Sequence, residues 1–137
     1  MNAIAQYTAP IGRVLISLIF IMAGFSKITG YAGTVGYMES QGVPGALLPV
    51  VIATELGLGI LVLIGWQTRI AAFLLAGFTV LTALFFHADF GDQTQSIMFM
   101  KNIAIAGGLL FLVAHGAGIL SVDNRQRAHG DSITGAI

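Results

Sequence analysis

The sequence contains no cysteine and very few charged residues, and these two absences limit what the chain can be. Without cysteine it cannot form disulfides, use a thiolate in catalysis, or hold a zinc finger or an iron–sulfur cluster with its own sulfur atoms. Charged residues are 9% of the 137 residues, whereas soluble domains carry roughly 25%. The net charge of +0 indicates no basic surface for nucleic acid. Apolar residues, in contrast, reach 56% and the mean hydropathy is +0.89, which predicts a membrane protein.

Four apolar stretches are each long enough, or nearly long enough, for the roughly 20 residues of a membrane-spanning helix. They predict an all-α integral membrane protein, a four-transmembrane-helix antiparallel bundle with helices at roughly 8–28, 46–66, 70–89 and 98–120. The first helix spans only if Arg13 and Lys27 extend their charges toward opposite interfaces. The second spans only if Glu55 is tolerated inside the membrane. All four helices belong to a single domain over 1–123.

The connections between these helices differ in length. Residues 29–45 predict a short amphipathic segment lying at the outer interface, although an ordinary loop fits them about as well. Residues 65–69 predict a tight turn between antiparallel neighbours. The last residues, 124–137, are polar and lack apolar periodicity, which predicts a mobile tail.

The positive charges predict the orientation. With the N-terminus inside, four cations lie on the cytoplasmic side and two, Lys27 and Lys101, lie on the other side. The four are Arg13, Arg69, Arg125 and Arg127. The positive-inside rule therefore predicts that both termini, and the tail 124–137, lie in the cytoplasm.

Glu55 is the most informative polar residue, because it lies near the middle of the second predicted span. A carboxylate at this depth needs a partner or must take up a proton, and such residues are functional candidates by default. Two interpretations stay open. Glu55 could form a structural clamp with Arg13, whose Cα is expected roughly 10 Å away in depth. Alternatively, Glu55 could belong to a proton-coupled or ligand-binding site.

Two groups of polar side chains are candidates for such a site. The predicted intramembrane polar site comprises Arg13, Glu55, Ser17, Thr79 and Thr82. The predicted outer-end polar cluster comprises Lys27, His87, Lys101 and Asn102. Arg13, Ser17 and Lys27 share one face of the first helix, together with Phe20 and Gly24. Lys101, Gly108 and His115 share a face of the fourth. No metal site is predicted, because His87 and Asp89, two positions apart, do not share a helix face.

The order and spacing of short motifs over residues 12–123 resemble those of the DoxX family of small four-helix bacterial membrane proteins. The motifs are Gly12-Arg13, Gly24-Phe25-Ser26-Lys27, Gly42-Val43-Pro44, Glu55 with Gly57 and Gly59, Gly65-Trp66-Gln67-Thr68-Arg69, Ala83 with His87, Lys101-Asn102, Gly107-Gly108-Leu109-Leu110, Gly116-Ala117-Gly118 and Ser121-Val122-Asp123. The resemblance implies that Glu55 and Arg13 correspond to the family's intramembrane Glu and its helix-one Arg. It also implies a multi-pass protein of the bacterial inner membrane and an association with membrane redox systems, including quinone-linked ones and complexes with soluble partners.

Three functions fit these residues. The first, which we favour, is a membrane subunit or scaffold of a redox complex, with quinone as a possible ligand and a soluble oxidoreductase as a possible partner; as an isolated chain it would not be an enzyme. The second is a small-solute transporter or channel that uses Glu55 and Arg13. Because a single bundle of this size is too small for an alternating-access cycle, this function would require an oligomer. The third is a structural membrane protein without a small ligand.

Overall fold

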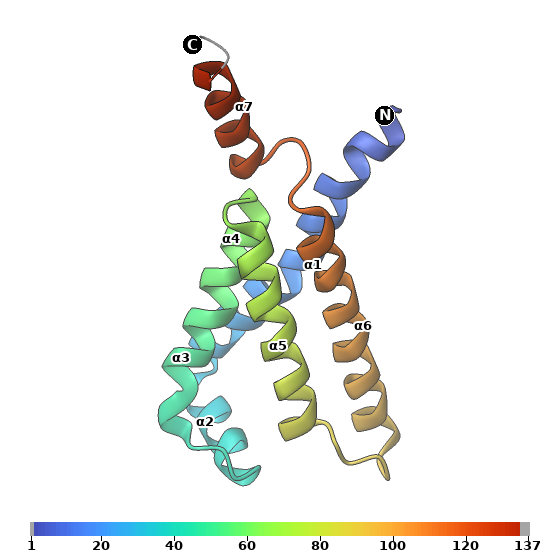
Figure 1. Cartoon of the computed structure of the whole chain (residues 1–137). Coiled ribbons are helices and arrows are strands. Elements are labelled where there is room, and N and C mark those ends of the chain that lie inside the picture. The colour runs from blue at the N-terminus through green and yellow to red at the C-terminus, as the bar shows by residue number, and fades with distance from the viewer. Residues whose placement is uncertain (1, 135–137) are drawn as a thin grey trace.

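The computed structural model describes residues 2–134, and these form helices joined by short connections, without strands (Figure 1). Four segments are long and apolar enough to cross a membrane: Ala3–Thr29, Gly45–Ile64, Thr68–Phe86 and Gln93–His115. The predicted all-α four-span bundle is therefore confirmed, with helix ends that differ from the predicted ones by up to five residues. One end of the bundle contains the start of the first span, the end of the fourth span and the turn between the second and third spans (Figure 1), and we call it the α7 end. We call the opposite end the α2 end.

The first span is the single helix α1 (Ala3–Thr29), and α2 (Tyr31–Ser40) follows it after one glycine. This short helix occupies the segment that the sequence predicted to be an interfacial element. Figure 1 shows α2 at the end of the bundle, beside the start of the second span. The second span consists of η1 (Gly45–Leu47), α3 (Leu48–Ala53), η2 (Thr54–Leu58) and α4 (Gly59–Ile64).

The second span is not the uniform α-helix that the sequence predicted, because η2 is a turn of π-helix. A π-turn inserts one extra residue into the helical ladder and is frequently found at functional sites. Glu55 is the second residue of this turn and is buried. The interruption therefore falls at the only ionisable residue of the span.

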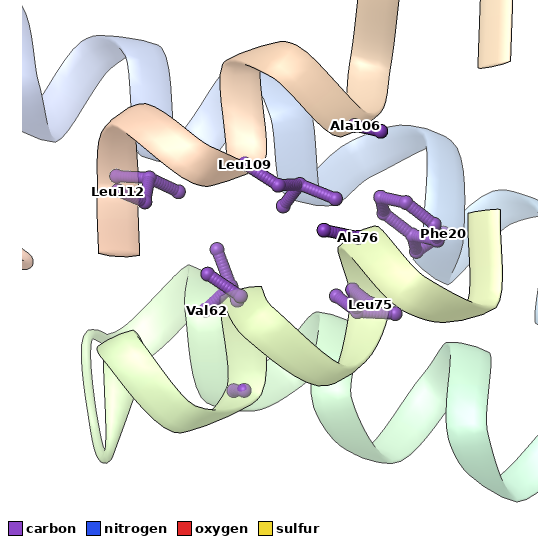
Figure 2. Packing of buried hydrophobic residues seen from close by; sticks show 9 residues of the cluster. Phe20, Val62, Leu75, Ala76, Ala106, Leu109 and Leu112 are labelled. Carbon is purple, nitrogen blue, oxygen red and sulfur yellow. The ribbon is translucent and has the colours of Figure 1, made fainter. Parts of the chain in front are cut away.

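The third span, α5 (Thr68–Phe86), and the fourth, α6 (Gln93–His115), lie side by side (Figure 1). Figure 2 shows Leu75 and Ala76 of α5 facing Ala106 and Leu109 of α6, with Phe20 of α1 beside them. Alanine at several of these positions allows the helices to approach closely. Most large apolar side chains instead point outward, as expected where lipid replaces water around the bundle.

The α6 helix ends at His115, five residues before the predicted end, and the chain then turns sharply. Gly116 has a φ of +76° and Gly118 a φ of +73°, a conformation that glycine adopts without strain. Residues 116–121 form a loop, and α7 (Val122–Thr134) follows it. Part of the polar tail is thus helical, which the absence of an apolar periodicity did not indicate.

Candidate functional site

A cavity of about 280 Å³ lies within the α2 end of the bundle. Its walls come from all four spans and from α2. The polar lining residues are Lys27, Thr34, Glu55, Thr79, Thr82, His87, Lys101 and Asn102, and the aromatic ones are Phe20, Tyr37, Phe78 and Phe86. We call this space the α2-end cavity. Its mixed lining, apolar walls with a few polar groups, is typical of sites for small organic ligands.

Lys27 and Glu55 form an ion pair in the wall of the α2-end cavity. The ammonium nitrogen Nζ lies 3.0 Å from Oε2 and donates a hydrogen bond to Oε1 at 3.1 Å. The Glu55 side chain is 8% exposed and that of Lys27 is 26% exposed. The carboxylate is therefore enclosed, while the ammonium retains a free face toward the cavity.

The packing of α1 against the second span explains why these two residues meet. A Cβ on Gly24 would lie 2.6 Å from Leu56, and one on Gly59 would lie 3.2 Å from Phe20. The glycines therefore permit close approach of two antiparallel helices, and their contacts set the register between them. With Gly24 beside Leu56, Glu55 lies level with the last turn of α1, which carries Lys27.

The opposite wall carries Asn102 of α6. Its Nδ2 donates to the carbonyl oxygen of Thr79 at 3.3 Å and to the hydroxyl of Thr82 at 3.2 Å, so it links α6 to α5. Nearby, His87 Nδ1 lies 2.7 Å from Gln95 Oε1, and because a carbonyl oxygen only accepts, Nδ1 is the donor. These bonds hold the polar groups of the two helices in place around the cavity.

The helix α2 covers the cavity at its end. Tyr37 of α2 stacks on Phe86 of α5 with ring centroids 5.7 Å apart, and Met38 is 3% exposed. The residues that α2 contributes, Thr34, Tyr37 and Met38, were not among the predicted site residues. A short segment without periodicity reveals nothing about what it covers until the four spans are assembled.

Arg13 lies at the α7 end, where it holds the loop after α6. It donates from Nη1 to the Ala117 carbonyl at 2.6 Å and from Nη2 to the Leu120 carbonyl at 2.9 Å. The predicted clamp between Arg13 and Glu55 is therefore wrong: Glu55 pairs with Lys27 instead. The two helices are antiparallel, and their register places Lys27 beside Glu55. The same register places Arg13 beside Gly65, at the far end of the second span.

The structure thus redistributes the two predicted groups of polar residues. Glu55, Thr79 and Thr82 of the intramembrane group line the same cavity as all four members of the outer-end cluster, Lys27, His87, Lys101 and Asn102. Arg13 and Ser17 are buried elsewhere, and the Ser17 hydroxyl donates to the Val14 carbonyl of its own helix at 2.8 Å. The face that Lys101, Gly108 and His115 share does not point into the core of the bundle, since Lys101 and His115 are exposed and the buried residues of α6 are Ala106, Leu109 and Leu112.

At the α7 end, Asp123 caps the start of α5. Its carboxylate accepts hydrogen bonds from the amides of Gln67 at 2.8 Å and Thr68 at 3.0 Å. Partial burial by itself would raise the pKa of Asp123, but the bonds from Thr68 and Gln67, with the charge of Arg127, outweigh burial and lower this pKa below its ordinary value. The cap joins α7 to the α4–α5 turn.

Comparison with known proteins agrees with this architecture. The DoxX family model matches residues 9–88. The inner membrane protein YqjF of Escherichia coli is 51% identical over 82% of this chain and 87% of its own length. The inner membrane protein YphA of the same organism is 40% identical over 84% and 87%. A Bacillus subtilis protein named "Putative oxidoreductase CatD" is 41% identical over 47% of this chain and 48% of its own length. No solved structure matches.

Proposed function

Because this chain belongs to the DoxX family and is a multi-pass inner-membrane protein, we propose that it is the membrane subunit of a redox complex and binds a quinone or a similar lipophilic carbonyl compound. The single observation that carries the proposal is the α2-end cavity with the Lys27–Glu55 ion pair in its wall. The cavity lies between helices that are otherwise apolar on their lipid-facing sides.

The lining fits the head group of a quinone. A quinone ring is flat and apolar on its faces, and its two carbonyl oxygens accept hydrogen bonds. Phe20, Phe78 and Phe86 provide aromatic contact for such a ring. Lys27 Nζ provides a charged donor, and a cavity of about 280 Å³ approaches the lower end of the usual range for small-molecule sites. A hydrophobic chain on the ligand would extend into the surrounding bilayer.

Lys27 and Glu55 have distinct parts in this proposal. Lys27 donates a hydrogen bond to a carbonyl oxygen of the ligand from the face of its ammonium group that Glu55 leaves free. Glu55 balances the charge of Lys27 and fixes its position, which reduces the cost of keeping the ammonium group inside the bundle. A bound quinone would supply the capacity to accept two electrons and two protons.

The electrons would come from a partner. The chain has no cysteine, so thiol-linked electron transfer cannot take place on it. The match to a Bacillus subtilis protein named as an oxidoreductase supports a redox setting, although that match covers 48% of the relative. We therefore infer that a soluble oxidoreductase docks on the membrane protein and exchanges electrons with the ligand.

A binding measurement tests the ligand. We expect the purified full chain in detergent to bind menadione and decylubiquinone, and to bind decylbenzene, which lacks carbonyls, much more weakly. Loss of a charge-assisted hydrogen bond in Lys27→Met should raise Kd by about tenfold or more. The double variant Lys27→Met/Glu55→Gln, which leaves no unpaired charge, should show the same loss, and Arg125→Gln on α7 is the control. Equal affinity for decylbenzene and the two quinones would refute the proposed ligand.

A second experiment tests the complex. The full chain is purified from its native membrane in mild detergent, and its proteins and extracted lipophiles are identified by mass spectrometry. We expect a soluble oxidoreductase and a quinone in stoichiometric amounts. The recovered amounts of both should be lower in the Lys27→Met/Glu55→Gln preparation. Recovery of the chain without either would favour a structural membrane protein. Solute flux in proteoliposomes that disappears in Glu55→Gln would favour a transporter or channel.

A further inference from the structure

A second hollow, of about 460 Å³, lies at the α7 end and is separate from the α2-end cavity. Thr68 and Arg69 at the start of α5, Gly116 after α6, and Asp123 and Arg127 on α7 contribute to its lining, and we call it the arginine pocket. Figure 1 shows the elements involved: the α4–α5 turn and α7 lie at the end of the bundle opposite α2. The proposed redox function uses none of these residues.

The two guanidinium groups converge on Gly116. A Cβ at this position would lie 3.6 Å from Arg69 Nη2 and 3.9 Å from Arg127 Nη2. Among residues 2–134, neither arginine has a carboxylate within ion-pair distance, and the oxygens of Asp123 already accept the amides of Gln67 and Thr68. The charge of Asp123 acts on Arg127, but two guanidinium groups against one carboxylate leave the pocket with a net positive charge, which favours an anion.

Thr68 supplies an independent indication. This residue lines the arginine pocket and is only 1% exposed. Its side chain interacts with the Asp123 carboxylate, but its hydroxyl oxygen Oγ1 makes no hydrogen bond of full geometry within the part of the chain that the structure describes. A buried hydroxyl without a well-formed hydrogen bond is costly, which favours a ligand atom that accepts its proton. A threonine hydroxyl beside two guanidinium groups matches the oxygens of a phosphate group.

The position of the pocket identifies the source of the phosphate. Arg69 is the second residue of one span, and Gly116 directly follows the last residue of another, so the pocket lies at the membrane surface. Lipid phosphates lie at this level. Four of the six Lys and Arg residues lie at this end, and two of them, Arg69 and Arg127, line the pocket. We propose that Arg69, Arg127 and Thr68 bind the phosphate of an anionic phospholipid headgroup.

Fluorescence of the single tryptophan tests this proposal, because Trp66 lies one residue from the pocket residue Gln67. The full chain is reconstituted into phosphatidylcholine vesicles that contain brominated phosphatidylglycerol or, separately, brominated phosphatidylcholine. At about a factor of ten per 1.4 kcal/mol, two basic contacts of about 1 kcal/mol each predict a tenfold or greater preference for phosphatidylglycerol in the quenching of Trp66.

Three variants make the test specific. Arg69→Gln/Arg127→Gln should bind the two lipids equally, and Thr68→Val, which keeps its backbone amide and its shape, should lose several-fold of the preference. Arg125→Gln removes the same charge from α7 outside the pocket and should keep the wild-type preference. Arg127→Gln alone should lose part of the preference. An equal loss in Arg125→Gln would overturn the proposal, because general attraction of positive charge to the surface would then explain the preference.

Inorganic phosphate distinguishes the two sources of the ligand. Millimolar sodium phosphate should leave the lipid preference in place, since a lipid also binds through its chains. Suppose instead that the two brominated lipids quench Trp66 of the wild-type chain equally and that sodium phosphate abolishes this quenching. The pocket then takes free phosphate, and the lipid assignment is wrong. The α2-end ligand is absent from every arm, so this result does not depend on the proposed redox function.

Discussion

Arg13 and Lys27 lie fourteen positions apart along α1 and both carry a positive charge into the bundle, but their surroundings differ. Arg13 is 3% exposed and donates to two backbone carbonyls of the loop after α6. Lys27 pairs with Glu55 in the wall of a cavity of about 280 Å³. Polar partners stabilise both charges, yet only Lys27 borders a space that a ligand can enter.

This comparison shows that a buried charge by itself does not mark a binding site. The carbonyls of Ala117 and Leu120 belong to the loop after α6, outside the hydrogen-bond ladder of any helix, and Arg13 supplies their partners. Arg13 therefore has a structural role that its position within the predicted first span does not reveal. Lys27 has a single carboxylate partner, and the remaining face of its ammonium group is available.

The largest expected effect is an all-or-none difference in reporter signal between the two ends of the bundle, because they lie on opposite sides of the membrane. The positive-inside rule predicts that the α7 end is cytoplasmic. A reporter fused after Ile137 should report the cytoplasm, and one inserted at Gly91, between α5 and α6, should report the other side. A cytoplasmic signal at Gly91 would reverse the orientation and place the α2-end cavity toward the cytoplasm.

The next largest effect is expected for Arg13→Gln. The variant loses two hydrogen bonds from a charged donor and leaves the Ala117 and Leu120 carbonyls without these partners, which should lower the free energy of unfolding by about 3 kcal/mol. Thermal unfolding in detergent measures the loss. Because Arg13 is not in the cavity wall, the folded fraction should bind menadione with wild-type Kd, and a weaker Kd would contradict the separation of the two ends.

Coupling between charged residues sharpens the same comparison. In a double-mutant cycle on Lys27→Met and Glu55→Gln, removing either partner leaves the other charge uncompensated, so the double variant should recover about 1–2 kcal/mol. The matched cycle on Arg13→Gln and Glu55→Gln should be additive within about 0.5 kcal/mol, because these residues do not meet. Coupling in the second cycle and additivity in the first would restore the Arg13–Glu55 clamp.

The smallest effect concerns Asp123 and depends on pH. Because the pKa of Asp123 is lowered in the folded protein, its ionised form stabilises the fold above the unfolded value near 3.9. That stabilisation is lost as the pH falls through the lowered pKa. Asp123→Asn should cost about 1 kcal/mol or less at pH 7, as expected for a partly exposed cap. The difference in Tm between the wild-type protein and the variant should therefore shrink in acid, and a constant difference would exclude this role.

The sequence alone determined the class, the number of spans and most of the polar residues that line the α2-end cavity. Long apolar runs can be stable in a bilayer only as helices whose backbone groups are satisfied internally, so composition and run length predict four spans. Seven of the nine predicted site residues line the α2-end cavity, because polar side chains inside a membrane must face the bundle interior.

Tertiary structure decided which of these residues meet. From the sequence, Glu55 is expected about midway in depth between Arg13 and Lys27, roughly 10 Å from each, so side-chain reach does not distinguish the two partners. The close contacts at Gly24 and Gly59 select the register that brings Lys27 to Glu55. The π-turn at Thr54–Leu58 and the cover that α2 places over the cavity also arise only once the helices pack. These features depend on contacts between segments far apart in the chain, which no local pattern of residues encodes.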